Sequence, residues 1–152
     1  PHAARRRTDL SRPVETRGQT PRLNWHTGAM QPLGVHHVSI NVSDAAESLE
    51  FYTGVLGLTA HTDRPDFPIV GAWLDIGGQQ VHLIEADVPN SCGQHFAIQV
   101  ADLDAALAEL HDRGIDVSDP SEVGTARQSF LFDPSGNMIE LHEPASAGTT
   151  TR

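Results

Sequence analysis

Four side chains that can bind a metal ion fall into two pairs with the same spacing along the chain. His37 and His95 are 58 residues apart, and so are His82 and Glu140 (95 − 37 and 140 − 82). Three imidazoles and one carboxylate suit a divalent transition metal such as Fe, Ni, Co, Mn or Zn. A ligand set with room for water or substrate is typical of a catalytic metal. The spacing therefore predicts a metal site built between two copies of a duplicated module.

The elements around these residues are expected to repeat in the same order. Alternating apolar residues predict strands at 35–42, 58–62, 71–76 and 79–85, with a helix from Ser43 or Asp44 to about Leu56. The second half is expected to hold strands at 94–100, 115–117, 128–132 and 138–142, with a helix at 102–112. Identical residues at the 58-residue spacing, with no insertion, indicate a duplication: Ile40 and Ile98, Val42 and Val100, Asp44 and Asp102, Leu49 and Leu107, Asp75 and Asp133, Gly78 and Gly136, Leu83 and Leu141.

Strand parity places the four candidate ligands on one kind of surface. On its own strand, each ligand alternates with apolar residues that are expected to pack under the helix of the same module. The ligands therefore face away from the helices. The predicted fold is α+β, with two tandem βαβββ modules forming a curled eight-stranded mixed sheet around a metal cleft and the helices on the outer face.

The charge of the chain is distributed unevenly. Residues 1–30 hold six arginines against two acidic residues, and we expect them to form a disordered basic tail. An extension ahead of Met30 is the preferred interpretation of this tail, and a basic arm and a transit peptide are the alternatives. The chain carries −10 and this tail +4, so residues 31–152 carry −14. Such an acidic body repels nucleic acid and favours a small molecule or a second copy as partner. Residues 31–144 are expected to form the domain, and 145–152 a frayed C-terminus.

Two further features concern location. The one cysteine, Cys92, excludes an internal disulfide and fits a reducing cytoplasm. No stretch of about 18 apolar residues predicts a membrane helix, and no apolar segment predicts a secretory signal. The sequence therefore favours a cytoplasmic protein without a membrane partner.

Five segments resemble the vicinal oxygen chelate superfamily, which includes glyoxalase I, extradiol dioxygenases and bleomycin resistance proteins. They are HHVSINVSD (36–44), FYTGVLGL (51–58), GGQQVHLIE (77–85), HFAIQVADLDAAL (95–107) and DPSGNMIEL (133–141), within about residues 33–144. The resemblance implies paired modules that form a cleft, often completed by a homodimer. It also implies metal ligands at His37, His95 and Glu140, with His82 at the position of a fourth ligand in glyoxalase I.

The resemblance implies a shared chemistry, in which the metal chelates two neighbouring substrate oxygens and acts as a Lewis acid. The first interpretation is a metal-dependent lyase or isomerase of the glyoxalase kind, in which Glu140 also shuttles a proton. The first alternative is an extradiol dioxygenase with Fe(II) or Mn(II), in which His82 is an acid–base group. The second is a binding or resistance protein without turnover. Phe130 stands where extradiol enzymes usually carry a tyrosine, which favours the glyoxalase interpretation.

The residues that surround the site are weaker predictions. Trp73, Phe67 and Phe130 are candidate walls of a substrate pocket, and each is equally compatible with the plain core. Arg127 is the candidate for binding a substrate carboxylate or phosphate, and the alternative is a surface role without a ligand. His142 shares the face of Glu140 and is expected to support it or to line the pocket. The spacing leaves open whether the site forms within one chain or between two.

Overall fold

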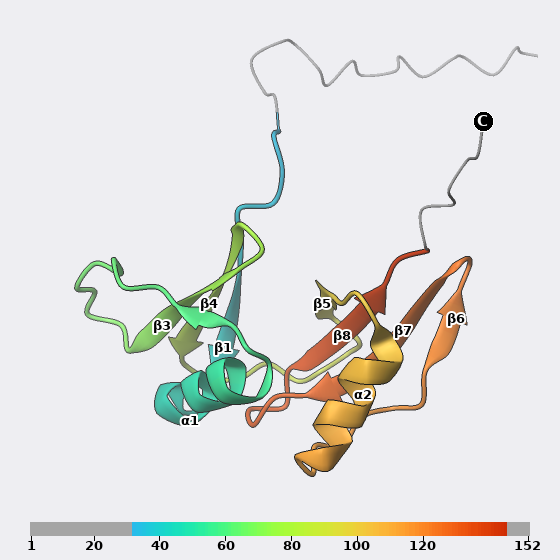
Figure 1. The fold of residues 1–152 in the computed structure, drawn as a ribbon. Helices are drawn as coiled ribbons and strands as arrows, with labels where there is room; N and C mark the ends of the chain where they lie inside the picture. The colour runs from blue at the N-terminus through green and yellow to red at the C-terminus, as the bar shows by residue number, and fades with distance from the viewer. Residues whose placement is uncertain (1–31, 146–152) are drawn as a thin grey trace, which may run out of the picture. The chain divides into compact units, whose positions relative to one another are not determined.

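The computed structural model describes residues 32–145, which form two modules with the same order of elements (Figure 1). The first module consists of β1 (His37–Val42), α1 (Ala45–Glu50), the π-helical segment η1 (Phe51–Val55), β2 (Thr59–Ala60), β3 (Gly71–Ile76) and β4 (Gln79–Glu85). The second consists of β5 (His95–Gln99), α2 (Leu103–Asp112), β6 (Ser121–Val123), β7 (Ala126–Phe132) and β8 (Met138–Glu143). The tandem βαβββ prediction is confirmed.

Each module builds one four-stranded mixed sheet. The strand orders are β1-β4-β3-β2 and β5-β8-β7-β6, with β1 parallel to β4 and β5 parallel to β8. Within residues 32–145 the eight strands thus form two sheets rather than one continuous sheet. β1 and β5 each end a sheet, so each has one edge without a strand partner in the described chain. This order brings the strands of the candidate ligands side by side, in one pair per module.

Both helices begin at an aspartate, as the repeat predicts. A carboxylate oxygen of Asp44 accepts hydrogen bonds from the backbone N–H groups of Ala46 and Glu47, each 2.9 Å long. Asp102 accepts one from the N–H of Ala105, also 2.9 Å long. These bonds satisfy N–H groups that have no partner inside the helix. The two caps fix where each helix crosses its own sheet.

The 58-residue offset holds for the ligand strands but not for the strands beside them. Trp73 of β3 lies opposite His82 of β4, and Phe130 of β7 lies opposite Glu140 of β8. Trp73 and Phe130 are therefore equivalent, although they are only 57 residues apart. The prediction that no insertion separates the modules is wrong at this hairpin. Four residues separate the paired Asp75 and Gln80, whereas five separate the equivalent pair Phe132 and Met138, and this extra residue shifts β7 by one position.

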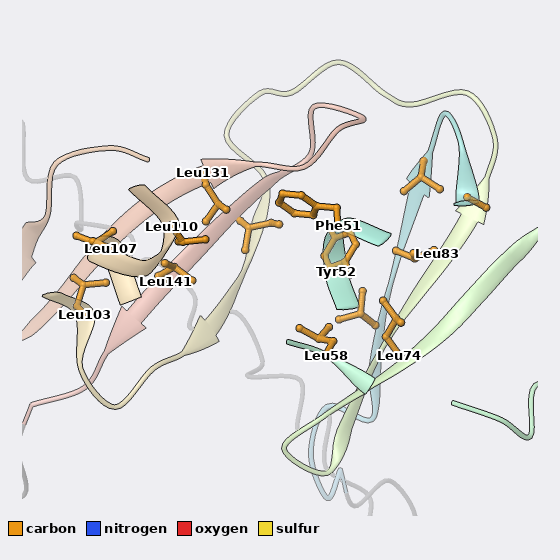
Figure 2. Packing of buried hydrophobic residues seen from close by; sticks show 14 residues of the cluster. Phe51, Tyr52, Leu58, Leu74, Leu83, Leu103, Leu107, Leu110, Leu131 and Leu141 are labelled. Atoms are coloured by element: carbon orange, nitrogen blue, oxygen red, sulfur yellow. The ribbon is translucent and has the colours of Figure 1, made fainter. Parts of the chain in front are cut away.

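A cluster of buried apolar side chains lies between the sheets and the helices. Each module contributes leucines, and Phe51 and Tyr52 of η1 belong to the same cluster (Figure 2). The labelled members are Phe51, Tyr52, Leu58, Leu74, Leu83, Leu103, Leu107, Leu110, Leu131 and Leu141. The apolar side of each strand is thus used against the helices, which leaves its other side to the candidate ligands.

The turn between β7 and β8 is held on the first module by buried polar groups. The Tyr52 hydroxyl donates a hydrogen bond of 3.0 Å to Oδ2 of Asp133. Asp133 also accepts from the backbone N–H groups of Ser135 and Asn137 and from the Asn137 amide, and that amide donates to the carbonyl of Asn41. Tyr52 is 0% exposed and Asp133 is 4% exposed. This turn therefore joins the modules by one buried bond, from Tyr52 to Asp133, and one part-buried bond, from Asn137 to Asn41.

Tyr52 is the sole tyrosine of the sequence, so its ionisation can be followed directly. Burial first, and then the charge and hydrogen bond of Asp133, raise the pKa of its phenol far above the ordinary value of 10.0. The folded state therefore keeps the proton, whereas the unfolded chain loses it near pH 10. Stability is then lost as the pH rises through about 10. We expect phenolate absorbance in an alkaline titration to appear only together with unfolding.

The control for this titration is Tyr52→Phe. Loss of stability above pH 10 should be weaker in this variant, because it lacks the group whose pKa changes on unfolding. A phenolate signal with a midpoint near 10 in protein whose circular dichroism remains native would contradict the buried position of Tyr52.

Other predictions about single elements differ from the structure. The strand expected at 115–117 is reduced to a single bridge between Val117 and Leu131, and the edge of the sheet is formed instead by β6. The expected basic tail at 1–30 and the C-terminal residues from 146 onward lie outside the described residues. In the described part, no helix is long and apolar enough to span a bilayer.

Candidate functional site

His37 and His82 form the first ligand pair. Their rings are stacked, with centroids 4.1 Å apart and an angle of 11° between the planes. Trp73 stacks on the other face of His82, with centroids 4.4 Å apart and an angle of 9°. The cross-strand register explains this contact, because Trp73 and His82 lie opposite each other on β3 and β4. His82 is thus held between two flat rings and is only 9% exposed.

A short chain of hydrogen bonds fixes which nitrogen of His82 carries the proton. The side-chain amide of Gln80 donates to Oδ1 of Asp75, 2.9 Å away, so its oxygen faces His82. That oxygen lies 3.0 Å from Nε2 of His82 and can only accept. Nε2 therefore holds the proton, and Nδ1 keeps its lone pair. A partner that orients the second ring nitrogen is usual for a metal-binding histidine.

The surroundings of His82 favour its neutral form. Burial lowers the pKa of this imidazole below its ordinary value, and the charges of His37, His36, His61 and Arg64 lower the pKa further. A metal ligand must be unprotonated, so this direction is the one that metal binding requires.

His95 and Glu140 form the second ligand pair. Nδ1 of His95 lies 2.8 Å from the carbonyl oxygen of Gly93, which can only accept, so Nδ1 carries a proton. Nε2 lies 2.9 Å from Oε2 of Glu140. In a neutral ring this nitrogen presents its lone pair to the carboxylate, and two lone pairs repel each other. The contact is favourable only with a cation, either a proton or a metal ion, so the pair fits a divalent metal.

His142 contacts the other oxygen of the same carboxylate. Its Nδ1 lies 2.9 Å from Oε1 of Glu140, two residues away on the same face of β8. Glu140 is 8% exposed and is thus held between two imidazoles in a place that water barely reaches. This position agrees with the supporting role that the sequence suggests for His142.

The structure forms the two pairs but does not bring all four ligand candidates together. Within residues 32–145, no group of three or more His, Cys, Asp or Glu side chains is placed so that it could hold a metal ion. Each pair lies on the two parallel strands of one module, His37 beside His82 and His95 beside Glu140. The set of four remains a prediction, and a complete site requires one pair from each of two modules.

The aromatic candidates lie next to the ligand pairs. Trp73 covers His82, and the ring of Phe67 is 5.9 Å from that of Trp73. Phe130 packs edge-on against His95 at 5.4 Å. All three therefore border a ligand pair rather than the centre of the core, and Phe67 is 44% exposed.

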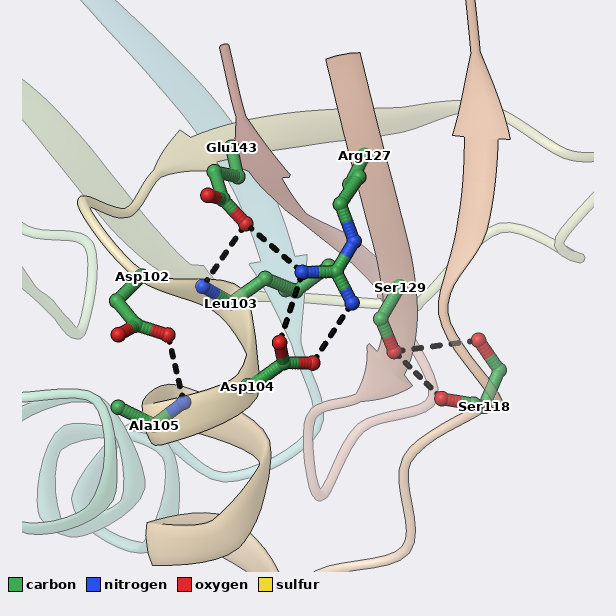
Figure 3. Close-up of polar contacts among 8 residues, drawn as sticks. All are labelled: Asp102, Leu103, Asp104, Ala105, Ser118, Arg127, Ser129 and Glu143. Atoms are coloured by element: carbon green, nitrogen blue, oxygen red, sulfur yellow. Dashed lines mark hydrogen bonds and ion pairs between the residues drawn. The ribbon is translucent and has the colours of Figure 1, made fainter. Parts of the chain in front are cut away.

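Arg127 has a different environment from the one proposed for substrate binding. Its guanidinium forms two bonds with Asp104, of 2.7 and 2.9 Å, and lies 3.3 Å from Glu143 (Figure 3). Glu143 in turn accepts from the backbone N–H of Leu103 at the start of α2. Arg127 thus ties β7 and β8 to α2, and its charge is already paired. This geometry favours the surface role over substrate binding.

Gln80 and Asp75 support the site, although the sequence did not single them out. Gln80 precedes His82 by two residues and so shares its strand face, which is the signal that could have shown it. Asp75 lies opposite Gln80 in the hairpin register, and its Oδ2 contacts His61 at 2.9 Å. The hydrogen bonds from His61 and Gln80 lower the pKa of Asp75, so it stays ionised and keeps accepting from Gln80.

Replacing Gln80 with leucine tests this support. We expect metal affinity to fall by about 10- to 100-fold, the range observed when an outer partner of a metal-binding histidine is removed. Isothermal titration with Ni²⁺ or Zn²⁺ measures this change. Gln79→Leu is the matched control, because Gln79 is exposed and precedes Gln80 directly. Equal affinities in the two variants would show that Gln80 does not orient His82.

Comparison with known proteins gives the family. The model of the Glyoxalase/Bleomycin resistance protein/Dioxygenase superfamily matches residues 34–141, which include both ligand pairs. The chain therefore belongs to this superfamily, and the resemblance seen in the sequence is confirmed.

Relatives within the superfamily have different roles. The protein YaeR of Escherichia coli (strain K12) is 32% identical over 124 residues, covering 72% of this chain and 95% of the relative. A lactoylglutathione lyase of Salmonella typhimurium is 28% identical over 127 residues, covering 74% and 93%. The solved structure of TnmS3, an antibiotic binding protein from Streptomyces sp. CB03234, is 27% identical with a TM-score of 0.64, covering 76% and 99%. The family thus includes an enzyme and a binding protein.

Proposed function

We propose that this protein is a metal-dependent lyase or isomerase of the glyoxalase kind. Its substrate would be a small molecule with two neighbouring oxygens. The observation that carries the proposal is the contact between His95 and Glu140, which is favourable only with a cation. The second support is His82, because burial lowers its pKa and Gln80 holds its Nε2, which leaves the lone pair on Nδ1. His37, His82, His95 and Glu140 would hold the metal.

The chemistry follows from the roles of these side chains. A divalent metal, when bound, polarises two neighbouring oxygens of the substrate and so acidifies the C–H group beside them. Glu140 accepts that proton on Oε2 and returns it to the adjacent carbon, so no other reactant is consumed. His142 holds Oε1 and keeps the carboxylate aimed during both transfers. Trp73, Phe67 and Phe130 exclude water from the side of the substrate.

Two copies of the chain would complete the site. Each module of the described chain holds one pair, and no group of three candidates forms within residues 32–145. β1 and β5 each leave an edge of a sheet unpaired in the described chain, and such edges readily accept a second chain. In a symmetric dimer, His37 and His82 would meet His95 and Glu140 of the partner subunit, and two equal sites would result.

Metal content and turnover test the function together. The protein is stripped with EDTA and loaded with Fe²⁺, Ni²⁺, Co²⁺, Mn²⁺ or Zn²⁺, and bound metal is counted by elemental analysis. We expect one ion per chain. Isomerisation is then assayed with the hemithioacetal of methylglyoxal and glutathione and with other 2-oxoaldehyde adducts. Failure to retain metal would overturn the proposal, and metal binding without turnover would favour a binding protein.

Mixing two inactive variants tests whether the site is shared. One variant carries His37→Ala with His82→Ala, and the other carries His95→Ala with Glu140→Ala. If the site lies between copies, co-refolded mixed dimers contain one intact site and should recover up to a quarter of the native activity. If the site lies within one chain, every mixture stays inactive, which would contradict the shared arrangement.

A further inference from the structure

A pocket in the first module is lined in part by His82, one member of the first ligand pair. Its volume is about 230 Å³, and its walls include Arg64, Phe67, Trp73 and His82. The two aromatic rings give it flat apolar surfaces, and His82 connects it to the proposed metal. Arg64 is its one cation that stays charged at any ordinary pH. The pocket therefore combines an apolar wall, a permanent positive charge and a candidate metal ligand.

Arg64 is not neutralised by any acidic group in the described residues. Of the three arginines in residues 32–145, Arg113 pairs with Glu109 and Arg127 pairs with Asp104 and Glu143, whereas Arg64 makes no ion pair there. The difference is notable in a chain with a net charge of −10, in which acidic partners are abundant. A cation without a counter-ion attracts an anion, and the attraction grows where the wall of a pocket displaces water.

The guanidinium of Arg64 is held in place by one hydrogen bond and one aromatic contact. Nη2 donates to the carbonyl oxygen of Ile69 at 2.7 Å, and the group lies over the ring of Phe67, 5.3 Å from its centroid. Nε is buried and has no hydrogen-bond partner in the described chain. An arginine has five N–H donors, and a carboxylate can accept two of them side by side. A buried N–H without a partner costs free energy, so an acceptor that reaches it would be bound favourably.

We propose that Arg64 binds a carboxylate of the substrate, so that the preferred substrates are small aromatic or apolar acids. That the bound acid is a substrate rests on the proposed function, whereas the binding of a carboxylate at Arg64 does not. The carboxylate would lie on Arg64 and the flat apolar part against Trp73 and Phe67, next to His82. The role that the sequence suggested for Arg127 thereby passes to Arg64. The loop at 61–70, rather than β7, selects the substrate.

Binding to metal-free protein tests this inference separately from the metal site. Phenylacetate and the neutral phenylacetamide have nearly the same shape and are titrated in EDTA, with the Trp73 indole N–H followed by NMR. We expect the native protein to bind phenylacetate more tightly than the amide. Arg64→Met should weaken phenylacetate binding by about tenfold or more, the effect of losing a charged hydrogen bond, and leave the amide unchanged.

Two further variants complete the test. Arg127→Met is the matched control and should bind phenylacetate within about twofold of the native protein. Arg64→Lys keeps the charge but not the paired donors and should recover part of the affinity. The inference is overturned if the native protein does not distinguish acid from amide, or if Arg64→Met and Arg127→Met weaken phenylacetate equally. Because no metal is present, neither result depends on whether the ion binds or turnover occurs.

Discussion

Replacing Glu140 with glutamine is expected to abolish turnover and to remove most metal affinity, while the fold stays intact. Glutamine keeps the size and one oxygen of the side chain but loses the negative charge. Metal affinity should fall by more than the 10- to 100-fold that is typical of outer partners, because Glu140 is a proposed direct ligand. Turnover should fall by a further factor of about 10² to 10⁴, because the group that carries the proton is gone.

The stability of the same variant separates loss of function from loss of fold. In the metal-free native protein, Nε2 of His95 and Oε2 of Glu140 lie 2.9 Å apart and need a cation between them. A glutamine N–H can donate to that nitrogen without any cation. We therefore expect the thermal midpoint of metal-free Glu140→Gln to equal or exceed that of the metal-free native protein.

The measurements for Glu140→Gln are isothermal titration with Ni²⁺ or Zn²⁺, the isomerase assay at saturating metal, and thermal unfolding in EDTA. Glu122→Gln is the matched control, because Glu122 is exposed on β6 and should change none of the three. If Glu140→Gln bound metal as tightly as the native protein, Glu140 would not be a ligand. If turnover also survived, its role in proton transfer would be excluded.

The parts of the fold that follow local rules could be read from the sequence. The period-two pattern around His37, His82, His95 and Glu140 gave the right faces, and Asp44 and Asp102 begin helices as expected. These features depend on residues that are close in sequence, and in a duplicated chain each pattern occurs twice. β6 escaped prediction because Ser121–Val123 is short and exposed, so no alternation of buried and exposed residues marks it.

The parts of the site that depend on tertiary contacts could not be predicted in the same way. The sequence favoured Arg127 for binding an anion, and only the folded positions of Asp104 on α2 and Glu143 on β8 show that its charge is already paired. Trp73 could be assigned to His82 only once the hairpin register was known, because a shift of one residue would turn it to the other face. Whether the two ligand pairs of one site come from one chain or from two depends on contacts between sheets. The spacing of residues along the sequence carries no information about those contacts.

Replacing Asp133 with alanine is expected to cause a large loss of stability. The carboxylate accepts from the Tyr52 hydroxyl, from two backbone N–H groups and from the Asn137 amide, and it is 4% exposed. Its removal leaves a fully buried hydroxyl and further donors without an acceptor. Each unsatisfied buried donor costs about 1–3 kcal/mol, so the free energy of unfolding should fall by about 3–5 kcal/mol.

Urea unfolding of four proteins tests both the size of this loss and its cause. The set is the native protein, Asp133→Ala, Tyr52→Phe and the double variant, with Asp119→Ala as the control for removal of an exposed aspartate. Part of the loss comes from the stranded hydroxyl of Tyr52, so Asp133→Ala should destabilise the Tyr52→Phe protein by about 1 kcal/mol less than the native protein. A loss below about 1 kcal/mol for Asp133→Ala would mean that water reaches the turn. Strictly additive effects would mean that Tyr52 and Asp133 do not act together. The expected result instead makes this turn the element that fixes β8, and with it Glu140, against the first module.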